Sequence, residues 1–188
     1  MDSDLTLDFI IIIVLIIANG LFSMTELAIV NAKKRKLEEL AESGNERAKT
    51  AFELSENPNE MFSTIQIGIT LVGILTGLYS GATFSGPLEE ILTANIPSIE
   101  PYAASVSSFL IVAIITYLSL VIGELVPKRL ALNSPEGIAV VVAKPIYWLS
   151  VALKPIVSFL GISTEFLLKI LGVTVKEEAP VTESEINK

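Results

Sequence analysis

The chain has 188 residues, of which 51% are hydrophobic, and a formal net charge of -8. This apolar content exceeds what the core of a soluble domain needs and predicts an all-α integral membrane protein. Cysteine and histidine are both absent, which excludes disulfide scaffolds, thiol nucleophiles, histidine-dependent triads and the usual zinc or copper sites. An enzyme is therefore not expected. Any bound metal must take oxygen ligands, as magnesium, calcium, sodium and manganese do, and the negative charge argues against a nucleic-acid partner.

The first apolar run, residues 9–30, is close to the ~20 residues with which a helix crosses a membrane. The basic string KKRK follows it at Lys33–Lys36, whereas Asp2, Asp4 and Asp8 precede or begin it and no basic residue does. The positive-inside rule then places the N-terminus outside. No basic n-region or small-residue cleavage site is present, so a cleaved signal peptide is not expected.

The next segment, residues 33–56, is polar, has apolar positions at helical spacing, and contains a break at Gly44. This pattern predicts a cytoplasmic helical hairpin. A second span over about 61–81 is rich in glycine and threonine and returns the chain to the outside. Residues 82–102 contain three prolines and no lysine or arginine, and they are expected to form an external loop.

The third span, over about 103–126, ends against Lys128 and Arg129 and returns the chain to the cytoplasm. Three crossings give an outside N-terminus and a cytoplasmic C-terminus in the plasma or inner membrane. As a check, all 13 basic residues lie between the first two spans or after Val126. None lies on a segment predicted to be external, as the positive-inside rule requires.

Residues 138–173 are apolar again, but lysines and prolines divide this stretch into short pieces. We expect a kinked juxtamembrane helix over about 136–173 that lies in the cytoplasmic interface, with Tyr147 and Trp148 at headgroup level. A re-entrant or spanning hairpin is the alternative. Residues 176–188 are charged and predict a linker to a further cytoplasmic region.

The most informative residue is Glu124, a carboxylate near the end of the third span in the string GELVPKR. An ionisable group at membrane depth is costly and indicates a functional site. Pro127 has no amide hydrogen, so the carbonyl of Gly123, four residues earlier, loses its helical partner. In lipid, such a carbonyl must face protein, water or an ion. Carboxylate and carbonyl oxygens together suit a hard cation.

Each span also carries one polar stripe at helical spacing. The first stripe is Asn19, Ser23 and Glu26. The second is Ser63, Gln66, Thr70, Gly73 and Gly77. The third is Thr116, Ser119, Gly123 and Pro127, with Glu124 beside it. We expect these stripes to meet inside the bundle and form a cation site.

Structural alternatives remain for every stripe. Asparagine and serine in membranes often only bond a neighbouring helix. Glu26 would then pair with Lys128 or Arg129, and Glu124 would either form a salt bridge to Lys128 one turn later or stay protonated. The glycine series from Gly73 to Gly81 is typical of close helix packing, including the packing of a dimer.

Four strings occur in order along the chain: FSMTELAIV with KKRKLEEL, ENPNEMFSTIQIGITLVGILTG, GELVPKRLAL, and NSPEGIAV. Together, from about Leu7 to Val175, they resemble the transmembrane domain of the CNNM/CorC magnesium transporters, which include bacterial hemolysin-like proteins. The resemblance implies a homodimeric membrane domain over residues 1–175 that exports Mg2+ in exchange for Na+. It also implies that the linker at 176–188 leads to a pair of CBS modules, through which ATP would bind.

The family holds a dehydrated magnesium ion with a serine on the first span, polar groups on the second and the Gly-Glu pair before proline on the third. By motif, these ligands correspond to Ser23, Asn19, Gly123, Glu124 and the backbone of Pro127. Many relatives carry an asparagine in GN-x-LVN on the second span, where this chain has GITLVG at 68–73. Either the ion selectivity differs, or the missing ligand is replaced by Gln66, Thr70 or Ser63.

Two functions of different classes follow. In the first, the site carries magnesium across the membrane. In the second, the same site is structural, and the protein is a non-transporting cation sensor or membrane scaffold that regulates a partner.

Overall fold

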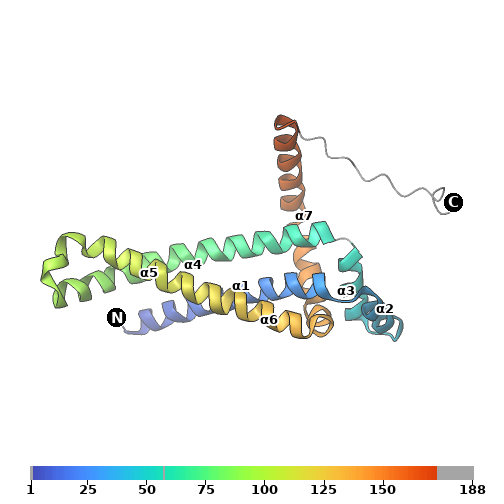
Figure 1. Cartoon of the computed structure of the whole chain (residues 1–188), viewed down its shortest axis with the longest axis horizontal. Coiled ribbons are helices and arrows are strands. Elements are labelled where there is room, and N and C mark those ends of the chain that lie inside the picture. Colours follow the sequence, from blue (N-terminus) through green and yellow to red (C-terminus); the bar gives the residue numbers. More distant parts are fainter. Residues whose placement is uncertain (1, 57, 173–188) are drawn as a thin grey trace. The chain divides into compact units, whose positions relative to one another are not determined.

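The computed structural model describes residues 2–56 and 58–172, and these residues form helices with no strand among them (Figure 1). In chain order the elements are α1 (Asp2–Asn31), α2 (Lys34–Glu42), α3 (Glu46–Glu56), α4 (Pro58–Asn95), the 3-10 helix η1 (Pro97–Tyr102), α5 (Ala103–Leu120), the π-helical turn η2 (Val121–Leu125), α6 (Val126–Asn133) and α7 (Pro135–Ile170). The all-α prediction is confirmed. The linker predicted at 176–188 lies outside the described residues.

Four helical stretches are long and apolar enough to cross a membrane: Leu5–Asn31, Pro58–Asn95, Pro97–Asn133 and Pro135–Ile170. The chain is therefore a multi-pass membrane protein. The first three stretches contain the three predicted spans. The fourth is the helix that the sequence assigned to the interface, and its length and composition also satisfy the requirement for spanning. Its interfacial position and its kink stay predictions.

The chain divides into two compact units, one ending at Val151 and the other beginning at Ala152. In the first unit α1 packs against α4 and α6, and α4 packs against α5. Figure 1 shows α4 and α5 as a long antiparallel pair with α1 alongside. Large apolar side chains such as Leu78 and Phe109 are exposed on these helices, as expected for surfaces that face lipid.

Helix α4 is longer than the span that the sequence predicts over about 61–81. The prediction of a loop over residues 82–102 was wrong, because α4 continues through Pro87 to Asn95 and the 3-10 helix η1 follows it. Proline and glycine predict breaks in soluble helices, but membrane helices tolerate both when neighbouring groups satisfy the freed backbone. Leu88 and Ile91 continue the apolar positions at helical spacing beyond Pro87.

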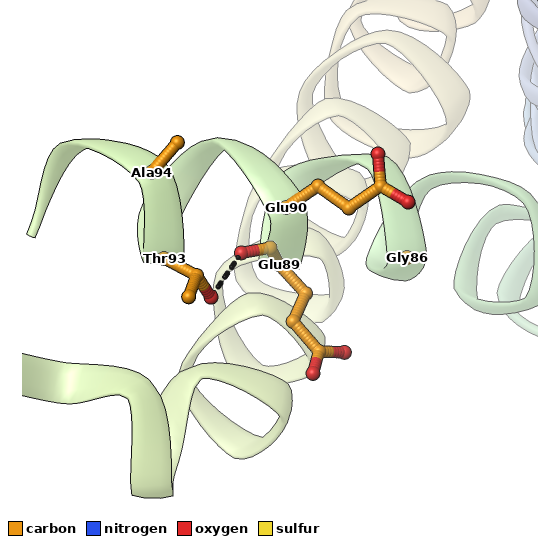
Figure 2. A pocket seen from close by; sticks show the side chains of 5 residues that line it. All are labelled: Gly86, Glu89, Glu90, Thr93 and Ala94. Carbon is orange, nitrogen blue, oxygen red and sulfur yellow. Dashed lines mark hydrogen bonds between the residues drawn. The ribbon is translucent and has the colours of Figure 1, made fainter. Parts of the chain in front are cut away.

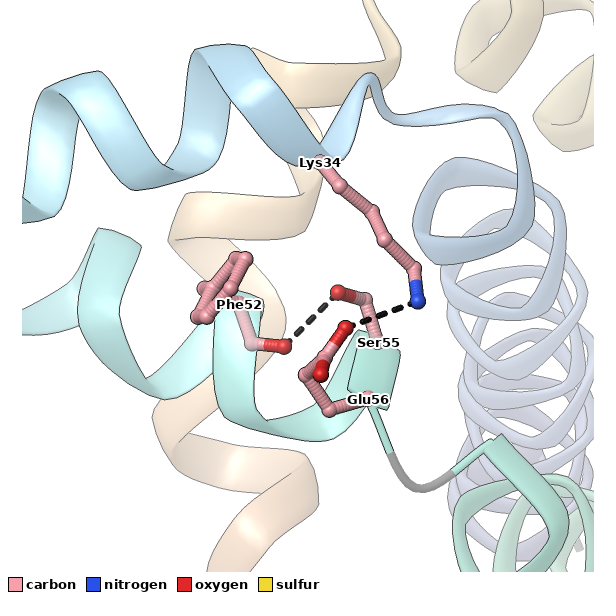
Figure 3. A network of polar contacts seen from close by, with 4 residues as sticks. All are labelled: Lys34, Phe52, Ser55 and Glu56. Carbon is pink, nitrogen blue, oxygen red and sulfur yellow. Dashed lines mark hydrogen bonds and ion pairs between the residues drawn. The ribbon is translucent and has the colours of Figure 1, made fainter. Parts of the chain in front are cut away.

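The predicted helical hairpin is confirmed by α2 and α3, which pack against each other. Gly44 lies between them with φ +93°, a left-handed conformation that glycine adopts without strain. Lys34 Nζ lies 2.8 Å from Glu56 Oε1 and links the start of α2 to the end of α3. Ser55 Oγ donates to the carbonyl of Phe52 at 2.7 Å in the same corner (Figure 3).

The hydrophobic core lies beside this hairpin. Its buried members include Ile29, Leu37, Leu54, Met61, Ile65, Ala139, Ala143 and Ile146. The first half of α7 therefore packs against the hairpin and the adjoining ends of α1 and α4. Lys36 Nζ also lies 3.4 Å from Glu136 Oε2, which joins α2 to the first turn of α7.

Candidate cation site

The third membrane helix changes its winding at the GELVP string. Residues Val121–Leu125 form the π-helical turn η2, in which the N–H of Val126 bonds to the carbonyl of Val121, five residues earlier. Single π turns inside α-helices occur frequently at functional sites. Here the turn ends two residues before Pro127, which cannot donate a backbone hydrogen bond.

The carbonyl of Gly123 finds its partner on another helix. Asn19 Nδ2 on α1 donates to this oxygen at 3.1 Å. The close approach depends on two glycines: a Cβ on Gly20 would lie 2.9 Å from Pro127 Cγ, and a Cβ on Gly123 would lie 3.2 Å from Asn19 Nδ2. The sequence Asn19-Gly20 therefore brings α1 against the π turn and satisfies the backbone group that proline leaves free.

The side-chain oxygen of Asn19, Oδ1, is buried and has no hydrogen-bond partner among the described residues. A buried acceptor without a donor or cation carries the full cost of its desolvation, so such atoms are uncommon in folded proteins. This oxygen is available to a cation.

Asn19 borders a cavity of about 210 Å³ whose lining comes from α1, α4, α5 and η2. The lining residues are Asn19 from α1, Gly73, Thr76 and Gly77 from α4, Ile115, Thr116, Ser119 and Leu120 from α5, and Glu124 from η2. Part of each stripe predicted from the sequence lines this cavity: Asn19 of the first, Gly73 and Gly77 of the second, and Thr116 and Ser119 of the third, with Glu124 beside them. Among the lining residues only Glu124 carries a formal charge.

Glu124 is engaged by a lysine of its own helix. Lys128 Nζ lies 2.7 Å from Glu124 Oε1, and the side chains are 33% and 38% exposed, respectively. The salt bridge that the sequence offered as an alternative for Glu124 is therefore present. Lys128 does not pair with Glu26 in the structure.

Two further candidates from the first and third spans, Ser23 and Pro127, are not among the residues that line the cavity. Ser23, one turn beyond Asn19 on α1, is only 2% exposed. Pro127 is buried and lies against Gly20. Whether these two residues contribute ligands stays a prediction.

The second-span candidates lie elsewhere. Gln66 and Thr70 are exposed, and Gln66 Nε2 donates to Thr70 Oγ1 at 3.5 Å. Ser63 Oγ donates to the carbonyl of Asn59 at 3.0 Å. The structure does not bring these three side chains to the cavity, and their role as substitutes for the family asparagine stays a prediction.

The sequence analysis missed Thr76, the hydroxyl that α4 does contribute to the cavity. Its position between Gly73 and Gly77 on the same helical face was the available signal. Thr76 Oγ1 donates to the carbonyl of Val72 at 2.7 Å, which leaves the lone pairs of the hydroxyl oxygen as acceptors.

No group of three or more carboxylates is gathered anywhere in residues 2–56 and 58–172. The cavity therefore offers a cation one carboxylate and several neutral oxygens. Magnesium is commonly bound by one or two carboxylates while it keeps several waters. A more heavily charged cage, typical of tight calcium sites, is not built here.

A second, more acidic hollow of about 600 Å³ lies near the end of α4 and is lined by Gly86, Glu89, Glu90, Thr93 and Ala94 (Figure 2). Figure 2 shows the carboxylates of Glu89 and Glu90 pointing in different directions. Thr93 Oγ1 donates to the backbone carbonyl of Glu89 at 2.9 Å and not to a carboxylate. These groups do not converge on one position.

Comparison with known proteins decides the family. The family model described as the cyclin M transmembrane N-terminal domain, CNNM, matches residues 10–188. The chain belongs to the CNNM family. This family is associated with membrane transport and not with enzymatic activity, and the resemblance found in the sequence motifs is confirmed.

Similar CNNM-family proteins come from several bacteria. The chain is 50% identical to the UPF0053 protein sll0260 of Synechocystis over 98% of its own length and 41% of that protein. It is 34% identical to the UPF0053 protein YugS of Bacillus subtilis over 96% of its length and 42% of that protein. It is 28% identical to the polyamine export protein of Escherichia coli over 94% of its length and 39% of that protein. The chain thus spans about two-fifths of these relatives.

Proposed function

We propose that this CNNM-family chain carries magnesium out of the cell through the cavity at Asn19 and Glu124, with sodium as the coupling ion. The observation that carries the proposal is the pairing of two unusual groups at one cavity. Asn19 presents a buried oxygen with no partner among the described residues, and Glu124 presents the cavity's only charge.

The size and chemistry of the cavity suit a partly hydrated ion. Its 210 Å³ exceeds the roughly 30 Å³ that one water takes up in the liquid, so an ion there could keep some of its waters. Magnesium gives up its waters reluctantly and prefers octahedral oxygen. Glu124 would neutralise part of its charge, while Asn19 Oδ1 and the hydroxyls of Thr76, Thr116 and Ser119 would bind the ion or its waters.

Transport requires that the cavity open alternately to the two sides of the membrane. The ion would enter from the cytoplasmic side, near Lys128 and Arg129, and leave outward as the helices rock. Sodium moving inward would supply the free energy. The proposed homodimer would form on the glycine series of α4 from Gly73 to Gly81, beside the cavity that Gly73 and Gly77 also line.

A polyamine is the second candidate cargo, and one observation in the structure favours it. Glu124 already binds a primary ammonium group, that of Lys128, at 2.7 Å. A polyamine presents the same group. The relative from Escherichia coli is named a polyamine export protein, and its cargo would suit this carboxylate and the neutral oxygens around it.

A non-transporting sensor or scaffold remains the rival in another functional class. It would use the cavity to stabilise one conformation when a cation is bound, and the conformation would be read by a cytoplasmic partner. Such a protein binds a cation without moving it.

The test measures transport from purified protein in sealed vesicles. Vesicles loaded with magnesium or with spermidine, with and without an opposing sodium gradient, would report which cargo leaves. Magnesium release that depends on the sodium gradient supports the first proposal, and spermidine release supports the second. Magnesium-dependent thermal stabilisation with no release of either cargo supports a sensor.

A further inference from the structure

The structure records one ion pair at the candidate cation site, between Glu124 and Lys128. We propose that Lys128 is a built-in competitor for the cargo: its ammonium group occupies Glu124 while the site is empty and is displaced when a cation binds. This inference rests on the proposed function and assigns a specific role to a residue outside the cavity lining.

The pair is built by local sequence. Glu124 and Lys128 are separated by four positions, and the winding through η2 and α6 places Lys128 Nζ 2.7 Å from Glu124 Oε1. In helices, an acid four residues before a base is the more favourable order of the two. The contact therefore forms without any rearrangement of α1, α4 or α5.

The pair is also able to open. Both side chains are about one-third exposed, so neither is locked by packing. Lysine has a flexible four-carbon stem and a compact charge, and it can extend toward the membrane interface while its backbone stays in place. A change of rotamer is enough to release Glu124.

Lys128 is suited to this role by its charge environment. The other residues that line the cavity, from α1, α4 and α5, are uncharged. A single carboxylate at this depth needs a counter-charge, and Lys128 supplies one when no cargo is bound. Arg129, the next residue, is exposed and forms no ion pair within the described part of the chain.

Competition has two consequences for transport. An incoming cation must first displace the ammonium group of Lys128. The apparent affinity of the site for the cation is therefore its intrinsic affinity multiplied by the fraction of sites that Lys128 leaves free. When the cargo leaves, Lys128 re-forms the pair and discourages rebinding. For a partly exposed pair, the expected loss in apparent affinity is up to about fivefold.

The experiment compares Lys128→Gln and Lys128→Met with Lys128→Arg and Arg129→Gln. Arg129→Gln removes the same charge from the neighbouring exposed position and controls for the general surface potential. Each variant is titrated with magnesium while its melting temperature is followed, and magnesium release from vesicles gives KM and kcat. Binding is thus measured independently of transport.

The neutral variants are expected to show a magnesium midpoint and a KM that are lower by up to about fivefold, with no rise in kcat. Lys128→Arg and Arg129→Gln should stay near wild type. In a Glu124→Gln background, Lys128→Gln should have no further effect on the midpoint, because the contested carboxylate is already gone.

An unchanged or higher midpoint in the folded neutral variants would overturn the inference. An equal shift in Arg129→Gln would overturn it too, because the effect would then belong to surface charge. If the neutral Lys128 variants fail to fold while Lys128→Arg folds, the double variant Glu124→Gln with Lys128→Gln decides. If the double variant also fails to fold, Lys128 is structural and the inference is overturned. If the double variant folds, the charge of Lys128 is needed only to balance the Glu124 carboxylate, as the inference requires. Binding shifts without release from wild-type vesicles would remove the export proposal and leave the competition intact.

Discussion

Asn19 donates its side-chain amide to the carbonyl of Gly123, across the contact between α1 and the π turn. The two bonded residues are 104 positions apart in sequence, and Asn19 Oδ1 is left buried with no hydrogen-bond partner among the described residues. Asn19 therefore satisfies the backbone carbonyl that Pro127 leaves free, and in the proposed function it also offers an oxygen to the cation. The structural and the proposed transport roles meet in this side chain.

Replacing Asn19 with Leu should affect both roles. The carbonyl of Gly123 would lose its donor, and a buried unsatisfied carbonyl costs about 1–3 kcal/mol of stability. Asn19→Leu should therefore melt at a lower temperature and lose magnesium-dependent stabilisation. Asn31→Leu is the matched control, since Asn31 is exposed on the same helix and donates only to the carbonyl of Leu27. Equal effects of the two substitutions would contradict the role given to Asn19.

Adding a methyl group at Gly20 should separate α1 from the π turn. The new Cβ would lie 2.9 Å from Pro127 Cγ and 3.1 Å from the carbonyl oxygen of Ile122. Overpacking of this kind costs about 1–3 kcal/mol, so Gly20→Ala should be less stable in thermal unfolding. At Gly161 a Cβ meets nothing within 4 Å, and Gly161→Ala should be neutral or slightly stabilising. A Gly20→Ala protein as stable as wild type would show that the contact is looser than described.

Another polar side-chain contact of α1 is made with α4. The hydroxyl of Tyr79 donates to the Asp8 carboxylate. Tyr79→Phe removes the donor but keeps the ring, and it should lower the melting temperature because Asp8 loses a hydrogen bond to its charged form. Tyr102→Phe, at an exposed tyrosine of η1, should leave the melting temperature unchanged. If both variants melt like wild type, the contact does not hold the two helices together.

The ion pair between α2 and α7 gives a further prediction. The side chain of Glu136 is 12% exposed and its partner is Lys36. Lys36→Glu should destabilise the chain, because two carboxylates would then face each other beside the core. Adding Glu136→Lys should restore only part of the lost melting temperature, because a lysine cannot accept the backbone hydrogen bonds that Glu136 accepts in the first turn of α7. Arg35→Glu is the control, because the side chains of the Arg35–Glu39 pair are 90% and 61% exposed, and it should lower the melting temperature much less. If the double variant Lys36→Glu with Glu136→Lys melts no higher than Lys36→Glu alone, the pair between Lys36 and Glu136 does not stabilise the fold.

Thr76 is the residue that the sequence analysis overlooked. Thr76→Val keeps the shape and removes the hydroxyl from the cavity wall. We expect a KM for magnesium that is raised severalfold, with little change in melting temperature. Thr70→Val is the matched control, because Thr70 is exposed on α4 away from the cavity. A raised KM in Thr70→Val, with none in Thr76→Val, would restore the sequence-based assignment.

The sequence predicted much of the fold because its signals are local. The hairpin followed from a polar segment with one glycine break, and the freed carbonyl of Gly123 followed from the position of Pro127. The length of α4 was not predictable in the same way. Whether a helix survives Pro87 depends on neighbouring groups that satisfy its backbone, and these come from tertiary packing.

The candidate site was predicted unevenly for the same physical reason. Asn19, Thr116 and Ser119 were predicted because polar residues at helical spacing on an apolar span indicate an inward face, and Glu124 because an ionisable group at membrane depth indicates a functional site. On α4 the spacing rule kept Gln66 and Thr70 on one face with Gly73, but α4 is 38 residues long and only part of it borders the cavity. The rule gives the face of a helix and does not give the height at which its partners meet it.

Magnesium release from vesicles is the most direct test of the central claim, with wild type compared with Glu124→Gln and Arg129→Gln. Glu124→Gln keeps the size of the side chain and removes the cavity's only charge. The account predicts release from wild type and from Arg129→Gln, and loss of release from Glu124→Gln in protein that remains folded. Equal release from Glu124→Gln and wild type would contradict the assignment of the cation site.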